Sequence, residues 1–256
     1  MKRSLVTVLG SAALLVAATP SAKAEAFLSL QNGATTVSCN TSIAFSAVNC
    51  GAGFTAVLGG SSIDFTGTVG GYTVSDVHLV SNQPGNAAIG FATDTKTLVQ
   101  NISAGATALV VSFAVNNFVL PAGIPLSLSA SQSATFIAAA AGSSQAFTGW
   151  GNIANTLLAG PGNGTPVATP TCVNPAAAPP ENACSSAGVP VLFTRAGNFA
   201  LNGVETINLN QGGMGNFQGT IAVTPPSAVP EPGSLVLLAT GLFGLVGGRR
   251  FLRRNA

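Results

Sequence analysis

Few side chains in this 256-residue chain are suited to chemistry, and His78 is the one histidine among them. Asp76 lies two positions before His78, and on a regular strand the two side chains would point to the same face and could pair. A serine nucleophile would complete a triad, but serine occurs throughout the chain and no Gly-x-Ser-x-Gly segment is present. We interpret the pair as a half-exposed histidine beside a carboxylate and assign no catalytic residue.

Paired carboxylates would also indicate chemistry, because two of them can hydrolyse a glycosidic bond or bind calcium. Away from the chain ends the available carboxylates are Asp64, Asp76, Asp94, Glu181 and Glu205. Asp64 and Asp76 flank a Gly70-Gly71 turn, so we expect them roughly opposite each other on adjacent strands. No aspartate-rich calcium loop is present, so we assign no metal and no cofactor, and a glycoside hydrolase stays an alternative.

Aromatic side chains could instead bind sugar rings by stacking. Trp150 lies between two glycines, and Tyr72 directly follows the Gly70-Gly71 turn. If either side chain is exposed, the chain could be a carbohydrate-binding module. The alternative is that Trp150 packs into the core or under a loop.

The four cysteines fall into two local pairs. The simplest of three connectivities joins Cys39 to Cys50 and Cys172 to Cys184, each closing a short loop in an oxidising compartment. A zinc site is the alternative, but no Cys-x-x-Cys spacing occurs and His78 is far away in sequence. We therefore expect two disulfides in an exported protein.

Alternating apolar and polar residues indicate the elements that hold these groups. Residues 109–115 and 126–133 alternate with a period of two, and no long segment of the body follows the helical period. Glycine, asparagine and proline interrupt the strand-like segments repeatedly. The pattern predicts an all-β fold for residues 25–224, an antiparallel β-sandwich that is jelly-roll-like.

One hairpin is predicted in detail. Ser62 to Val69 and Tyr72 to Ser81 are expected as its strands, with Gly70-Gly71 accepting the positive φ of a type I′ turn. The apolar residues change face midway along the second strand. This change of phase predicts a β-bulge near Ser75-Asp76.

Proline and glycine dominate residues 160–188. We interpret this segment as a long loop inserted in the single domain, rather than a strand region, with a disulfide between Cys172 and Cys184 holding it together. Residues 225–233 follow as a proline-containing linker.

The N-terminus has the features of a secretory signal peptide. An apolar run from Leu5 to Ala18 follows two basic residues and is too short to span a bilayer comfortably. Ala22-Lys23-Ala24 fits a small-x-small cleavage site, and Ala24-Glu25-Ala26 is the neighbouring choice. We predict that residues 1–24 are removed, with an uncleaved anchor as the alternative.

The C-terminus combines three features in order. Pro230, Glu231 and Pro232 come first, and an apolar run at residues 234–248 follows. Four arginines then precede the end of the chain: Arg249, Arg250, Arg253 and Arg254. The prolines hold their segment extended for a protease cleft, while Glu231 supplies its charge. The run predicts a short transmembrane-like helix, and the basic residues 249–256 would stop translocation and stay cytoplasmic.

This tail resembles the PEP-CTERM sorting signal of exopolysaccharide-producing Gram-negative bacteria, over about residues 229–254. In such proteins a membrane protease-transpeptidase, exosortase, recognises the tag and cuts near Pro-Glu-Pro. The resemblance implies that Pro230, Glu231 and Pro232 are the recognition residues and that exosortase is a partner. It also implies export through the inner membrane, transient anchoring, and release to the envelope or an extracellular destination. An ordinary single-pass tail anchor is the alternative.

The charge distribution argues against a nucleic-acid partner. Seven of the nine basic residues lie in the two terminal signals, and Lys96 and Arg195 are left in the body against five acids. Such a body lacks the clustered cations that nucleic acids and anionic membranes attract. Its many hydroxyl and amide side chains suit contact with carbohydrate instead.

Together these features predict an exported, non-enzymatic protein of the envelope or biofilm matrix. We expect a structural or adhesive role in contact with extracellular polysaccharide. A secreted enzyme acting on polysaccharide, or a carbohydrate-binding module, is the alternative.

Substitution Glu231→Ala tests the sorting signal. The change removes the one charge of the Pro-Glu-Pro segment, so we expect the variant to keep its tail and accumulate in the membrane fraction, while the parent protein loses it. Immunoblots of membrane and released fractions measure this. Identical fractionation of the two proteins, with both tails retained, would contradict the prediction.

Overall fold

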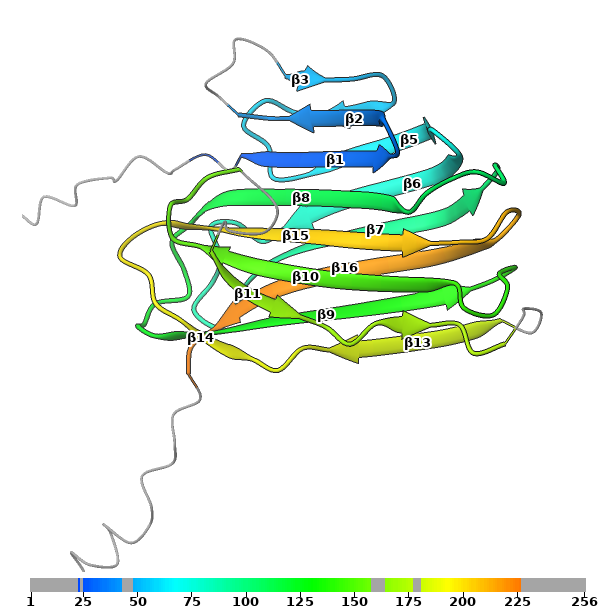
Figure 1. Ribbon diagram of the computed structural model, residues 1–256. Coiled ribbons are helices and arrows are strands. Elements are labelled where there is room, and N and C mark those ends of the chain that lie inside the picture. Colours follow the sequence, from blue (N-terminus) through cyan, green and yellow to red (C-terminus); the bar gives the residue numbers. More distant parts are fainter. Residues whose placement is uncertain (1–22, 24, 43–47, 158–163, 177–180, 227–256) are drawn as a thin grey trace, which may run out of the picture.

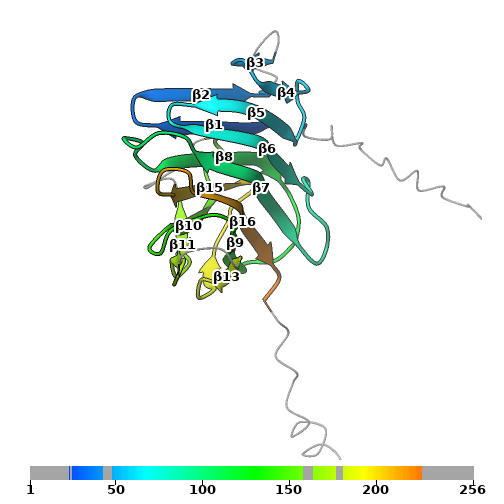
Figure 2. The same cartoon turned by 90° about the vertical axis from the view of Figure 1, so that its right-hand side faces the viewer.

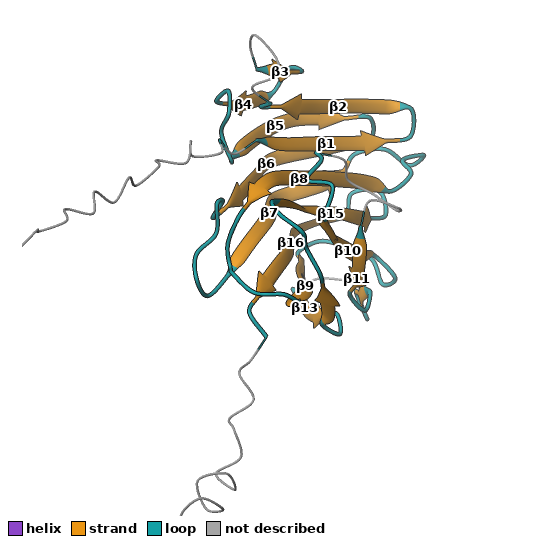
Figure 3. Cartoon of the chain, turned by 90° about the vertical axis from the view of Figure 1, so that its left-hand side faces the viewer, coloured by secondary structure: helices purple, strands orange, loops and turns teal. Residues whose placement is uncertain are grey.

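The computed structural model describes residues 23, 25–42, 48–157, 164–176 and 181–226, which form two antiparallel sheets packed face to face (Figure 1). The described elements are strands joined by loops (Figure 3). In this part of the chain no helix is long and apolar enough to cross a membrane. Most of the predicted signal peptide, the Pro-Glu-Pro residues 230–232, the apolar run and the four arginines lie outside the described residues.

Sheet A has eight strands in the order β11-β10-β15-β8-β1-β2-β3, with β12 also pairing with β10. Its strands are β1 (Ala26–Asn32), β2 (Thr35–Asn40), β3 (Asn49–Cys50), β8 (Leu109–Phe118), β10 (Ser144–Asn152), β11 (Thr165–Ala168), β12 (Cys172–Val173) and β15 (Phe199–Asn208).

Sheet B also has eight strands, in the order β13-β9-β16-β7-β6-β5-β4, with β14 also pairing with β9. Its strands are β4 (Phe54–Ala56), β5 (Ile63–Val69), β6 (Tyr72–Ser81), β7 (Gly90–Asn101), β9 (Leu126–Phe136), β13 (Asn182–Ala187), β14 (Val191–Phe193) and β16 (Met214–Thr224).

The strands from β7 onward follow jelly-roll topology. Successive strands β7, β8, β9 and β10 alternate between the sheets, and β15 and β16 return to lie between them, β15 between β8 and β10 and β16 between β7 and β9. This return is the double Greek key of a jelly roll. Strands β1 to β3 and β4 to β6 extend both sheets at the same end, opposite β11 and β13 (Figure 2). The predicted jelly-roll-like sandwich is confirmed.

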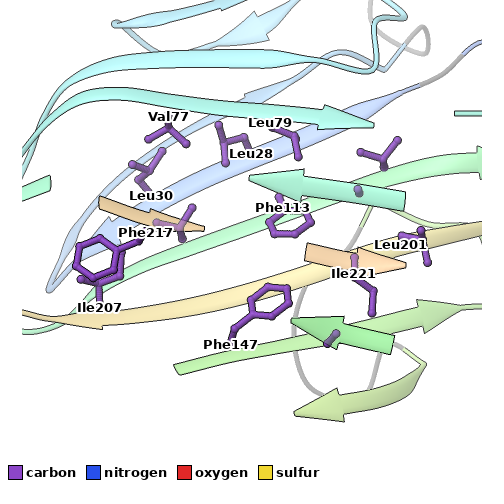
Figure 4. Packing of buried hydrophobic residues seen from close by; sticks show 14 of the residues in the cluster. Leu28, Leu30, Val77, Leu79, Phe113, Phe147, Leu201, Ile207, Phe217 and Ile221 are labelled. Carbon is purple, nitrogen blue, oxygen red and sulfur yellow. The ribbon is translucent and has the colours of Figure 1, made fainter. Parts of the chain in front are cut away.

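The core lies between the sheets and follows the predicted alternation. Along β9 the apolar residues Leu126, Leu128 and Ala130 are buried, whereas the serines between them face outward. Figure 4 shows labelled side chains of both sheets meeting in this layer, among them Phe113 of β8 and Ile221 of β16. Each large apolar side chain buried in this way contributes about 1.5–3 kcal/mol.

The predicted hairpin is formed by β5 and β6. Its register shifts between Phe65 and Gly67, opposite Val77 and Val74, so the extra residue lies at Ser75-Asp76 and the predicted bulge is confirmed. The predicted turn type is wrong, because Gly70 has a φ of 56° while Gly71 does not adopt positive φ. That combination fits type II′. The Gly71 N–H donates to Asn32 Oδ1 at 2.9 Å, which holds the second turn residue in place.

The segment 160–188 is more regular than the sequence suggested. Its strands β11, β12 and β13 lie at the edges of the two sheets, so the prediction of a long loop without strands is wrong there. Proline is tolerated on an edge strand because its missing N–H faces no neighbour. Pro166 shows this, since it lies within β11 and is exposed.

Both predicted disulfides are present. Cys39–Cys50 joins β2 to β3 within sheet A. Cys172–Cys184 joins β12 of sheet A to β13 of sheet B, so it ties the two sheets together at the end of the sandwich opposite β3 and β4.

The first strand bears on the two candidate signal-peptide cleavage sites. Glu25 Oε2 accepts a hydrogen bond from Asn116 Nδ2 at 2.7 Å, and the Ala26 N–H donates to Thr41 Oγ1 at 2.7 Å. Cleavage after Ala24 leaves both residues in the mature chain. Cleavage after Ala26 would remove them, so the contacts favour the earlier position.

Substitution Gly203→Ala tests how tightly Phe113 and Phe147 of the neighbouring strands of sheet A pack over Gly203. A β-carbon at Gly203 would lie 2.8 Å from Phe147 Cε2 and still closer to the Phe113 ring. We expect overpacking to lower the free energy of unfolding by about 1–3 kcal/mol, measured by urea denaturation. Gly105→Ala is the control, because a β-carbon there meets nothing within 4 Å. Equal stability of the two variants would contradict the described packing.

Candidate functional site

A row of polar side chains crosses the outer face of sheet B. The strand register places one residue of each of seven strands side by side: Thr55, Asp64, His78, Thr95, Gln218, Ser133 and Ser185. We call these residues the polar row. Six steps between strands of about 4.8 Å make it roughly 29 Å long.

A hollow of about 440 Å³ lies at the β9–β13–β16 end of the polar row. Residues of β9, β13 and β16 line it, and most of them carry a hydroxyl or an amide group: Ser131, Gln132, Ser133, Ser185, Ser186, Ala187, Gln218 and Thr220. Thr93 and Thr220 share a hydrogen bond at 2.7 Å beside it. Hydroxyls and amides both donate and accept hydrogen bonds, so the surface is chemically complementary to another polyhydroxylated surface.

The histidine sits within the polar row, but its partner is not the predicted one. Asp64 lies opposite His78 and contacts its Nδ1, whereas Asp76 lies opposite Thr97 of the neighbouring strand. The expectation that Asp64 and Asp76 face each other is therefore wrong, because the turn and bulge shift the register. The side chains of His78 and Asp64 are 42% and 46% exposed, which is typical of a weak surface pair.

The two aromatic candidates for sugar stacking are buried. Trp150 is 6% exposed and Tyr72 is 1% exposed. The Tyr72 hydroxyl accepts a hydrogen bond from the Leu209 N–H at 3.3 Å, which ties β6 to the end of β15. Neither ring can stack on a sugar in this structure.

Two of the five candidate carboxylates converge, but they do so inside the core. Lys96 Nζ contacts Asp94 Oδ2 and lies 2.7 Å from Glu205 Oε2, and all three side chains are completely buried. Asp94 and Lys96 belong to β7 of sheet B, whereas Glu205 comes from β15 of sheet A. We call these three residues the buried triad.

Apolar strand neighbours surround the buried triad. Lys96 lies between Val77 and Phe217 in sheet B. Glu205 correspondingly lies between Phe147 and Val111 in sheet A. The charges therefore compensate one another among apolar strand neighbours.

Two donors complete the hydrogen bonding of the carboxylates. Gln145 Nε2 donates to Glu205 Oε1 at 2.8 Å, and the Gly219 N–H donates to Asp94 Oδ1 at 3.1 Å. Burial raises the pKa of Glu205 to about 7, although Lys96 works in the opposite direction. Burial alone would lower the pKa of Lys96, but the two carboxylates outweigh it and the pKa is raised.

The sequence contained a signal for the buried triad that the charge count did not use. Thr93, Thr95 and Thr97 alternate with Asp94 and Lys96, and a threonine-rich face is the outward face of a strand. The alternation therefore marks Asp94 and Lys96 as inward-facing residues. Among the described residues, no three His, Cys, Asp or Glu side chains are placed to hold a metal ion.

The comparisons with known proteins concern the tail most directly. Residues 228–254 match the family model of the PEP-CTERM protein-sorting motif, so the predicted resemblance is confirmed. The motif indicates an extracellular protein that exosortase sorts. It implies export and transient anchoring of the C-terminus in the membrane before processing.

Two solved structures resemble the body distantly. No curated protein matches the chain. A structure of infectious bursal disease virus, Gx strain, is 12% identical over 89% of this chain and 55% of the viral chain, with a TM-score of 0.25. An isomalto-dextranase of Arthrobacter globiformis T6 complexed with panose is 15% identical over 64% of this chain and 23% of the enzyme, with a TM-score of 0.23. This chain spans less than two thirds of either length, and neither likeness carries a functional argument.

Substitution Lys96→Met tests the compensation of charge in the core. Removing the cation leaves Asp94 and Glu205 buried without it, so we expect the free energy of unfolding to fall by about 3–5 kcal/mol. Urea denaturation measures the loss. The triple variant Lys96→Met, Asp94→Asn, Glu205→Gln carries no charge there and should recover much of it.

The half-exposed surface pair supplies the control. His78→Ala should lower the free energy of unfolding by less than about 1 kcal/mol, because water screens its contact with Asp64. A Lys96→Met variant as stable as His78→Ala would contradict a charge-compensated core.

Proposed function

We propose that this protein is a non-enzymatic, structural or adhesive component of the cell envelope or extracellular matrix, and that the outer face of sheet B contacts polysaccharide. The observation that carries the proposal is the polar row, which runs unbroken across seven strands. An uninterrupted line of hydroxyl, amide, imidazole and carboxylate groups matches an extended polyhydroxylated chain better than it matches a compact ligand. Export through the sorting motif brings this face to a compartment that contains such polymers.

The polar outer face of sheet B is suited to many weak contacts with one polysaccharide chain. With Trp150 and Tyr72 buried, hydrogen bonds have to provide the recognition, and each contributes only about 0.5–1.5 kcal/mol net. Many copies of the protein along one polymer would gain strength by multivalency. This behaviour suits a matrix component rather than a carrier of one sugar.

The placement of the carboxylates supports a role without catalysis. A glycoside hydrolase needs two carboxyl groups on either side of a substrate that can enter between them. In this protein Asp94 and Glu205 converge on Lys96 inside the core, where neither side chain has any exposed surface. Asp64, which does face solvent, pairs with His78 instead of a second carboxylate.

Removal of hydroxyls from the polar face tests the proposal. We expect the triple variant Thr95→Val, Ser131→Ala, Ser133→Ala to bind several-fold more weakly than the parent protein to extracellular polysaccharide isolated from the producing bacterium. Co-sedimentation with the polymer measures the bound fraction. Each change removes one hydroxyl and preserves the strand.

The matched control lies on the outer face of sheet A. Ser29, Ser112 and Thr148 occupy outward positions on β1, β8 and β10, so Ser29→Ala, Ser112→Ala, Thr148→Val removes the same three hydroxyls from the opposite face. This variant should bind as the parent does. Equal weakening of both variants, or of neither, would sink the assignment to sheet B.

A further inference from the structure

We propose that Lys96 and Glu205 form an intramolecular amide bond, which links sheet B covalently to sheet A through the centre of the core. The reactants are a primary amine and a carboxylic acid held together without access to water. Lys96 Nζ lies 2.7 Å from Glu205 Oε2, so the amine is held directly against the carboxyl group that it would attack.

The surroundings provide the groups that amide formation needs. Asp94 contacts Lys96 Nζ and is the base that accepts its proton. Gln145 Nε2 donates to Glu205 Oε1 at 2.8 Å, so it stabilises the negative charge that develops on this oxygen during attack. With a pKa raised to about 7 by burial, Glu205 is available as the neutral acid, which is the form that an amine attacks.

The reaction balances without any oxidant, cofactor or further reactant. Asp94 takes a proton from the ammonium group, and the freed lone pair of Nζ attacks Glu205 Cδ. A C–N bond forms, and the bond from Cδ to Oε2 breaks. Asp94 passes this proton to the departing oxygen, which already carries the proton of the neutral acid and leaves as water. Asp94 then accepts the second proton from the nitrogen, so the products are one amide, one water and Asp94 as the neutral acid.

Glu205 is assigned as the acyl partner on two grounds. Burial raises the pKa of Glu205 to about 7, so this carboxyl group is available as the neutral acid that an amine attacks. Glu205 also belongs to β15 of sheet A, opposite the β7 strand of Lys96 in sheet B. An amide to Asp94 would only close a ring within β7.

The close placement of the two reacting groups and the exclusion of water from them favour the reaction. Well-oriented groups within one molecule react as if one were present at roughly 10⁵–10⁸ M. The triad is completely buried and Phe147 lies against Gly219 beside it, so the water that is released escapes from an apolar layer. An amide also replaces a buried ion pair whose desolvation is costly.

Mass spectrometry of the purified full-length secreted protein tests the bond. After reduction, alkylation and digestion with pepsin, we expect the peptides that contain Lys96 and Glu205 to appear as one linked species, lighter than their sum by one water. Fragmentation should place the link between the two side chains. Separate, unmodified peptides would overturn the proposal, and so would a loss of water confined to the Asp94–Lys96 peptide.

Three variants sharpen the assignment. Glu205→Gln should give a linked species of the same mass as the parent, because its amide releases ammonia in place of water. Asp94→Asn keeps the amine and the acid but loses the base, so the linked fraction should fall at least tenfold. Lys96→Met should give none, and a linked species in this variant would contradict the assignment. The unsubstituted protein decides the matter even if a variant fails to fold.

Discussion

Until the proposed amide forms, the sandwich is organised around one buried cation, Lys96, held between carboxyl groups of opposite sheets. Lys96 and Asp94 come from β7 and Glu205 from β15, so the charges compensate only when both sheets are stacked in the correct position. A sheet displaced along its partner would leave a charge in an apolar layer, at a cost of several kcal/mol. Gly203 and Gly219 leave room for the Phe147 ring beside the triad. The buried triad thereby fixes the alignment of the two sheets, which the surrounding apolar contacts alone would not specify.

The β-bulges of strands β6 and β7 lie next to the buried triad. Bulges at Ser75-Asp76 of β6 and Thr97-Leu98 of β7 lie side by side, and each shifts the inward-facing residues by one position. Before the bulge β7 directs Asp94 and Lys96 into the core, and after it the strand directs Val99 inward while Leu98 is 40% exposed. A shift of one residue exchanges the faces of a strand, so the bulge lets Lys96 and Val99, which are three positions apart, both face the core.

Much of this fold was predictable from the alternation of apolar and polar residues. In a sheet with one face in the core and one in solvent, every second side chain of a strand points to the same face. The Ser75-Asp76 bulge and both disulfides followed from local spacing. The strands within residues 160–188 did not, since edge strands tolerate proline and lack the two flanking neighbours that select β-branched residues. The buried triad also escaped prediction, because Lys96 and Glu205 are distant in sequence and a charge is normally taken as a surface feature. The outward threonines beside Lys96 were the available signal.

The core and the surface of this exported protein have different roles. The interior holds its charges in one compensated triad, while the outer face of sheet B offers the polar row to its surroundings. Amide hydrogen exchange of the parent protein and of Lys96→Met tests most directly that the triad fixes the sandwich. The account predicts that amides of residues 93–97 and 204–207 exchange last in the parent and lose protection together in the variant. Slowest exchange elsewhere, or unchanged protection at these residues in Lys96→Met, would contradict it.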